Sequence, residues 1–125
     1  MTKPTDEPID KNPPVLYRGH RVRILQTPTF QKWLDGLRDR QARLRIDDRI
    51  KRLAAGNPGD TKPVGDRVHE LRLAFGPGYR VYYIWRGDTL IILLSGGDKD
   101  SQARDIVKAK SIATEIENAN ETGAV

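Results

Sequence analysis

Three basic residues in the second half of the chain have the type and spacing to handle a phosphate group. Arg72 and Arg80 flank a glycine-rich turn at 76–78, in segments whose alternating pattern predicts two antiparallel strands. The alternation places both side chains on one face of the hairpin, where each guanidinium can bind two phosphate oxygens. Lys99 follows two glycines at the end of an apolar segment, from which it can reach the same edge of the sheet. Together these residues predict a cradle for a phosphodiester.

The same residues also have a purely structural interpretation, and the sequence leaves it open. Arg72 can belong to a solvated sheet face and pair with Glu70 or Asp66, which are close to it in the chain. Lys99 can be an exposed turn residue. The arginine-rich segment over 38–52 is typical of a solvated helix face, and the alternative that it supplies general attraction to RNA stays open.

Other catalytic chemistries have little support in the sequence. His20 and His69 are the two histidines and lie far apart, which disfavours a nuclease with a histidine pair. Asp98 and Asp100 are better explained as turn and helix-cap residues than as metal ligands. The glycine-rich phosphate loops of nucleotide-binding proteins do not occur. We therefore predict no metal ion and no cofactor.

Composition and charge narrow the class of protein further. The chain has 125 residues, which fits one domain with one core, and its net charge of +5 suits a polyanionic partner such as nucleic acid or an acidic protein. The absence of cysteine excludes disulfides and zinc–thiolate sites. No apolar run approaches the roughly 20 residues that cross a bilayer. We expect a cytoplasmic protein without a membrane partner.

The first half of the chain predicts one short strand and two helices. A strand is expected over 22–26, after which Thr27 and the proline that follows it indicate the start of a helix running to about Leu37. A second helix, capped by Asp39, is expected to run to Ala55 because its apolar residues recur at helical spacing. The short break between these helices predicts a helical hairpin.

The second half predicts a sheet and a last helix. A turn-rich connection over 57–66 is followed by expected strands over 68–75, 79–85 and 89–95, and then by a helix to about residue 116. The resulting order β-α-α-β-β-β-α predicts an α+β fold. A small twisted, mainly antiparallel sheet would pack against the helical hairpin and the C-terminal helix, with the helices on one face and the two arginines on the other.

The ends of the chain are polar and lack a hydrophobic period. We expect residues 1–20 to form a flexible N-terminal arm, residues 21–116 to form the folded domain, and residues 117–125 to form a flexible tail.

Several motifs resemble the RelE/ParE superfamily of type II toxins, in its HigB-like branch of phage Gp49-like, or addiction module killer, proteins. The most specific pieces are Glu-Leu-Arg at 70–72, Gly-Tyr-Arg-Val-Tyr at 78–82 and Gly-Gly-Asp-Lys at 96–99, in this order. The resemblance covers about residues 22–115. It implies a RelE-like fold, with residues 21–116 as the RelE/HigB-like toxin domain.

The resemblance implies a toxin that cleaves mRNA in the ribosomal A site without a metal ion. In such enzymes the 2′-hydroxyl of the substrate attacks the adjacent phosphate and leaves a cyclic phosphate, so orientation and charge stabilisation supply most of the catalysis. Carried over to this chain, Arg80 would hold the scissile phosphate and Arg72 would stabilise developing negative charge. Lys99 would neutralise the leaving oxygen or act as proton donor.

Four further residues are expected to bind RNA around these three: Lys62, Arg67, Tyr82 and Arg104. The chain departs from the family pattern at two positions. Arg104 stands where some RelE-like enzymes have a catalytic tyrosine, and Glu70 stands where those enzymes are basic. No tyrosine base can therefore be carried over to this chain.

The implied partners are a helix-turn-helix antitoxin that covers the basic face, the ribosome, and the mRNA in its A site. Two alternatives remain on the sequence alone. A ParE-like DNA gyrase inhibitor would share the fold without being a nuclease, and a degenerate member would only bind an antitoxin. The arginine and lysine set favours the nuclease, although a fold by itself does not decide a function.

Overall fold

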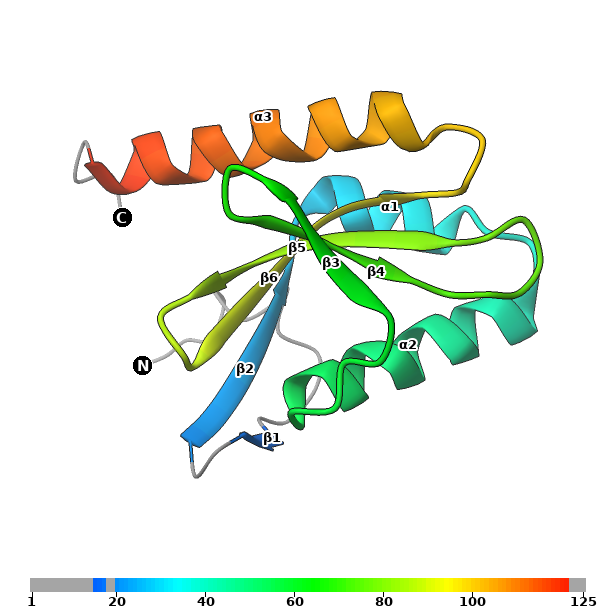
Figure 1. The fold of residues 1–125 in the computed structure, drawn as a ribbon, viewed down its shortest axis with the longest axis horizontal. Helices are drawn as coiled ribbons and strands as arrows, with labels where there is room; N and C mark the ends of the chain where they lie inside the picture. The colour runs from blue at the N-terminus through cyan, green and yellow to red at the C-terminus, as the bar shows by residue number, and fades with distance from the viewer. Residues whose placement is uncertain (1–14, 18–19, 122–125) are drawn as a thin grey trace, which may run out of the picture.

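The computed structural model describes residues 15–17 and 20–121, and within them the fold is mixed α+β (Figure 1). The strands are β1 (Val15–Tyr17), β2 (His20–Gln26), β3 (Thr61–Gly65), β4 (Val68–Arg72), β5 (Arg80–Arg86) and β6 (Leu90–Gly97). The helices are α1 (Pro28–Asp35), α2 (Arg40–Ala54) and α3 (Gln102–Glu121). The described strands form one sheet in the order β1-β2-β6-β5-β4-β3, in which β2 and β6 run parallel and the other neighbours antiparallel.

The two helices of the first half begin where their capping residues predict. The Thr27 hydroxyl accepts a hydrogen bond from the Phe30 amide at 3.0 Å and donates one to the Leu94 carbonyl at 2.7 Å, so it ties α1 to β6. The Asp39 carboxylate accepts from the amides of Gln41 and Ala42 at the start of α2. These side chains satisfy amides that have no partner within their own helix.

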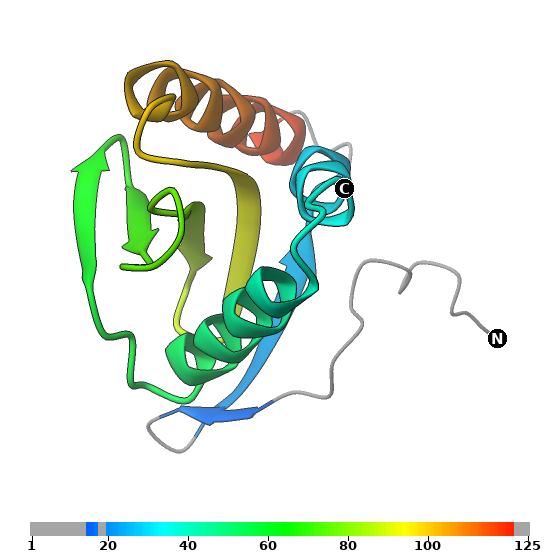
Figure 2. The ribbon, with the colours of Figure 1, turned by 90° about the vertical axis from the view of Figure 1, so that its right-hand side faces the viewer.

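The sheet has a hydrophobic cluster on each face. Its larger cluster packs against α1 and α2 and includes Phe30, Ile46, Val81 and Leu93. The smaller cluster includes Ala109 and lies under α3. Figure 2 shows α2 and α3 on opposite sides of the sheet. The expectation that the helices share one face was therefore wrong, because alternate residues of β5 and β6 are apolar on both faces and both need cover.

Several boundaries differ from the prediction. β3 lies in the expected turn-rich connection, and β1 lies in the expected arm; the remaining arm residues 1–14 and 18–19 are outside the described part. β3 was missed because it contains a proline and a glycine and is an edge strand, where backbone pairing needs no apolar alternation. α3 continues to Glu121, past the predicted end at 116, and residues 122–125 of the expected tail are outside the described part.

Candidate functional site

The two arginines singled out from the sequence are direct neighbours in the sheet. Arg72 of β4 and Arg80 of β5 are partners in the antiparallel register. Side chains that are paired in this way point to the same face and come close together. That face lies under α3, so the predicted pairing is present but the face is not open. The Arg80 side chain is 12% exposed, while that of Arg72 is 35% exposed.

A buried carboxylate stands next to Arg80. Glu70 is fully buried, and its Oε2 accepts hydrogen bonds from the Tyr82 hydroxyl at 3.0 Å and from Gln102 Nε2 at 2.8 Å. Arg80 Nε lies 3.8 Å from the same oxygen. Gln102 is the first residue of α3, and no sequence signal singled it out. Glu70, with Arg80, Tyr82 and Gln102 around it, thus links β4, β5 and α3 through a buried polar cluster.

Arg72 has a different partner from those expected. Its Nε lies 3.3 Å from Asp60 Oδ2, and both side chains of this pair are substantially exposed. Glu70 pairs with Arg80 instead, and Asp66 lies 3.8 Å from Lys110 on α3. An exposed ion pair of the Arg72–Asp60 kind is weak, so a phosphate can compete for this arginine.

Tyr82 cannot serve as the RNA contact that we expected. Its side chain is fully buried, with no surface for a ligand, and donates its hydroxyl to Glu70. Burial and the neighbouring Glu70 carboxylate both raise the pKa of Tyr82. The residue is therefore a permanent hydrogen-bond donor inside the fold, and neither an RNA-binding group nor a base.

Lys99 and Arg80 meet at Gly78. A Cβ atom placed on Gly78 would lie 3.2 Å from Lys99 Cβ and 3.4 Å from Arg80 Nη1, so both side chains lie against this glycine. Arg80 Nη1 donates to the Gly78 carbonyl at 3.0 Å, and the Lys99 amide donates to the Pro77 carbonyl at 3.4 Å. Gly78 also has a φ of +80°, which disfavours any side chain there. The predicted approach of Lys99 to Arg80 is present.

The other predicted RNA-binding residues lie at increasing distances from this point. Lys62 is exposed on β3 and is the register partner of Glu70, one strand away from the arginine pair. Arg104 is exposed on the first turn of α3. Arg67 lies in the turn just before β4 and pairs with Glu117 near the end of α3, at 3.6 Å. The structure thus gathers Arg72, Arg80 and Lys99 but leaves Arg67 apart.

His69 stands on the opposite face of the sheet. Its ring stacks on Tyr83 with the centroids 5.3 Å apart, and burial lowers the pKa of His69. This agrees with the packing role that a lone histidine suggests. Among residues 15–17 and 20–121 no cluster of three metal-ligating side chains occurs, and no helix is long and apolar enough to cross a membrane.

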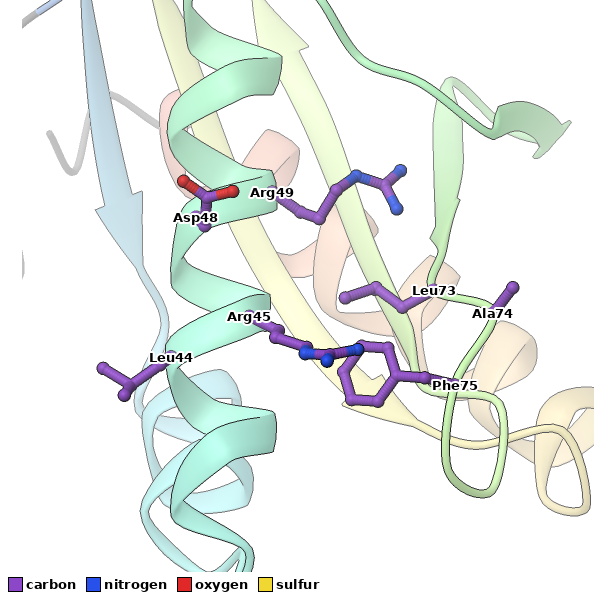
Figure 3. A pocket seen from close by; sticks show the side chains of 7 residues that line it. All are labelled: Leu44, Arg45, Asp48, Arg49, Leu73, Ala74 and Phe75. Carbon is purple, nitrogen blue, oxygen red and sulfur yellow. The ribbon is translucent and has the colours of Figure 1, made fainter.

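A pocket lies on the face of the sheet that α2 covers, between α2 and the loop after β4 (Figure 3). Its volume is about 420 Å³, and the guanidinium of Arg45 covers the Phe75 ring with 4.7 Å from the Arg45 Cζ to the ring centroid. Arg49 donates to the backbone carbonyls of Arg72 and Pro58, at 2.8 and 2.9 Å. Arg49 is thus engaged by backbone carbonyls and Arg45 packs on Phe75, and none of the three basic side chains proposed for catalysis lines this pocket.

Comparison with known proteins shows similarity to a protein family and to a protein of another organism. The family model described as phage derived protein Gp49-like matches residues 32–121, which is more than half of the chain. An uncharacterized protein of Haemophilus influenzae is 47% identical over 95 residues, and the match spans 76% of this chain and 96% of that protein.

Proposed function

The chain belongs to the phage-derived Gp49-like family, a family of the RelE/HigB-like toxin kind, and from this premise we propose that it is a metal-independent endoribonuclease that cleaves mRNA in the ribosomal A site. A family of this kind implies an antitoxin partner. The observation that supports the nuclease is the meeting of Arg80 and Lys99 at Gly78, with Arg72 beside Arg80 in the sheet.

Arg80 is the residue best suited to hold the scissile phosphate. Its Nε faces the buried Glu70 carboxylate and its Nη1 bonds the Gly78 carbonyl, so the guanidinium is fixed before the substrate arrives. Its Nη2 makes no hydrogen bond within the described part of the chain, and 12% of the side chain is exposed, so this nitrogen is the one that we expect to meet a phosphate oxygen. A preoriented charge of this kind stabilises the transition state without reorganisation during the reaction.

The reaction needs no group that the chain lacks. The 2′-oxygen forms a bond to phosphorus, the bond from phosphorus to the 5′-oxygen breaks, and a 2′,3′-cyclic phosphate remains. Lys99 donates a proton to the departing 5′-oxygen, and Arg72 neutralises charge on the phosphate. The 2′-hydroxyl proton passes to solvent, because Tyr82 is buried as a donor and His69 lies on the other face.

RNA end-mapping after brief induction tests this function. Wild type should produce in-frame cuts in translated mRNA, and Arg80→Ala should reduce their frequency by about 100-fold, the usual scale for loss of one charge-stabilising group. Arg52→Ala is the matched control, because it removes an exposed arginine that lies on α2 and pairs with Asp48. This control should cut mRNA like wild type.

Other outcomes would identify the alternatives. Growth arrest with intact mRNA, DNA double-strand breaks and an SOS response would identify a ParE-like gyrase inhibitor. Harmless expression would identify a member that only binds an antitoxin. We propose that the antitoxin is a helix-turn-helix protein, and its co-expression should restore growth in cells that carry the wild-type toxin.

A further inference from the structure

A groove opens beside the end of β6, between α1 and the first turns of α3. Its volume is about 520 Å³, and its walls include Lys32, Trp33, Gly97, Arg104 and Lys108. Only Arg104 in this set was singled out from the sequence as an RNA contact. The groove exists because β6 ends in two glycines, which let both helices come close to the strand.

Each of these glycines leaves room for a side chain from a neighbouring helix, which packs directly against the strand. A Cβ atom on Gly96 would lie 2.2 Å from the Trp33 ring, and one on Gly97 would lie 1.8 Å from Asp105 Oδ2. Alanine at either position would force these groups apart. Trp33 is also held by Phe30 and Tyr79, with ring centroids 5.8 and 6.3 Å away, so the indole is a fixed wall of the groove.

The most exposed charged side chains of this groove are positive, whereas its two acids are half-buried. Lys32, Arg104 and Lys108 are exposed and make no ion pair within the described residues. The two acids of the lining, Asp98 and Asp105, are engaged in the loop. Asp98 Oδ1 accepts from the amides of Asp100 and Ser101, at 2.9 and 3.1 Å, and Asp105 accepts from the Ser101 hydroxyl. Three available cations therefore surround a fixed aromatic wall.

The groove lies next to the place where Arg80 and Lys99 come together at Gly78, which we call the Arg80–Lys99 surface. Gly97, which lines the groove, is the register partner of Arg80, and Lys99 follows it by two residues. The end of β6 is thus next to both, and a nucleic-acid strand with one phosphate at Arg80 can extend along it into this groove. Basic side chains around an aromatic surface are how proteins hold single-stranded nucleic acid, with phosphates on the cations and bases against the ring.

We propose that this groove is a nucleotide subsite, which binds the phosphate and base of the RNA residue adjacent to the scissile bond. The proposal rests on the proposed function, because that function supplies the strand at Arg80. Lys32, Arg104 and Lys108 bind the backbone phosphate and Trp33 contacts the base. The subsite determines affinity and the placement of the strand, while Arg80 and Lys99 carry out the chemistry.

Binding can be measured separately from cleavage. The probe is a fluorescent single-stranded oligoribonucleotide of about eight residues with 2′-O-methyl groups, which cannot attack the phosphate. Its anisotropy gives the affinity of the full chain as salt is varied. The double variant Lys32→Ala/Lys108→Ala should bind about tenfold more weakly, and the slope of log affinity against log salt should fall by up to about 0.7, since both lysines hold the same phosphate and one phosphate contact on a single strand contributes about 0.7.

The control removes the same charge elsewhere. Lys51 and Arg52 lie on the exposed side of α2, where they pair with Asp47 and Asp48. The double variant Lys51→Ala/Arg52→Ala should retain wild-type affinity within about twofold. Equal losses in the two double variants would mean general attraction to a basic protein and would overturn the subsite. Unchanged binding by Lys32→Ala/Lys108→Ala would overturn it too.

Trp33→Phe tests the base contact while keeping an aromatic wall. Binding of the oligonucleotide should quench tryptophan fluorescence in wild type, and this quenching should largely disappear in the variant, with an affinity loss of about fivefold. A urea midpoint equal to that of wild type shows that the fold is intact. Full quenching in the variant would come from Trp85 and would contradict the proposal.

Two further measurements distinguish ribosomal RNA from a single-stranded substrate as the ligand of the groove, and RNA binding by the groove from the proposed nuclease function. If Lys32→Ala/Lys108→Ala loses sedimentation with mRNA-free ribosomes but keeps oligonucleotide affinity, the groove binds ribosomal RNA and the subsite is wrong. If induced wild type leaves mRNA uncut while the oligonucleotide results hold, the nuclease function fails and RNA binding by the groove stands.

Discussion

The two faces of the sheet are built on different principles. The face under α1 and α2 buries apolar side chains such as Phe30 and Ile46 in one large cluster. The face under α3 has a smaller cluster, and next to it a buried Glu70 with Arg80 and Gln102 around it. Buried charge adds little net stability compared with apolar packing. The comparison indicates that one face supports the fold, while the other gives up apolar burial in order to hold an arginine in place.

The unmatched atoms on the second face support this view. Glu70 Oε1 and Arg80 Nε are buried and make no hydrogen bond in the described part of the chain, although the carboxylate is close to the guanidinium. Leaving such groups incompletely bonded costs free energy. We infer that Glu70 is a positioning residue, which directs the outer nitrogens of Arg80 toward Gly78 and Lys99.

The largest effect is expected from breaking the apolar face. Phe30→Ala should lower the free energy of unfolding by about 3–5 kcal/mol, because it removes a fully buried ring and leaves a cavity. Urea denaturation followed by circular dichroism measures this loss. Val107→Ala on the exposed side of α3, where Val107 is 69% exposed, is the control and should change stability by less than about 0.5 kcal/mol. A loss below about 1 kcal/mol for Phe30→Ala would contradict the comparison.

A change on the polar face should separate stability from activity. Glu70→Gln keeps the shape of the side chain and removes its charge. The free energy of unfolding should fall by less than the roughly 3–5 kcal/mol that loss of one partner costs in a fully buried ion pair, because Arg80 keeps some contact with solvent. RNA cleavage should fall by about 10- to 100-fold, since a small displacement of a positioned charge has effects of this size. Cutting is measured by end-mapping at equal protein levels.

A double-mutant cycle makes this second prediction specific. In an Arg80→Ala background, Glu70→Gln should cause no further loss of cleavage, because the group it positions is gone. Tyr82→Phe removes one hydrogen bond to Glu70 and leaves Arg80 opposite the carboxylate, so it should cost about 1 kcal/mol of stability with little loss of activity. Additive losses in the cycle would mean that Glu70 acts on the fold alone.

The smallest effect is the pH dependence of stability that we expect from His69, on the face under α2. Burial lowers the pKa of His69 below its usual 6.5, so the unfolded chain binds more protons than the folded chain as the pH falls through 6.5. The stability due to neutral His69 is present above pH 6.5 and is lost as the pH falls through the lowered pKa. The urea midpoint of wild type should therefore fall more between pH 7.5 and 5.5 than that of His69→Gln. Parallel curves would show that His69 does not contribute.

Much of the local structure was predictable because it depends on near neighbours in the chain. Thr27 and Asp39 cap their helices through amides two or three residues away. Alternation placed Arg80 and Tyr82 on one face of β5 and Val81 and Tyr83 on the other. The edge strand β3 was missed, since its pairing with β4 follows from backbone geometry and leaves no apolar pattern in its own residues.

What the sequence determined by itself was the set of elements with a local signal, the hairpin that pairs Arg72 with Arg80, and the family motifs around them. The tertiary structure alone decided that α3 covers the arginine face, that Glu70 belongs to Arg80 and Gln102, and that Tyr82 is buried. It also placed Lys99 against Gly78. The reason is physical: these contacts join residues about 10 to 32 positions apart, and they depend on which surfaces must be hidden from water once the whole sheet has formed.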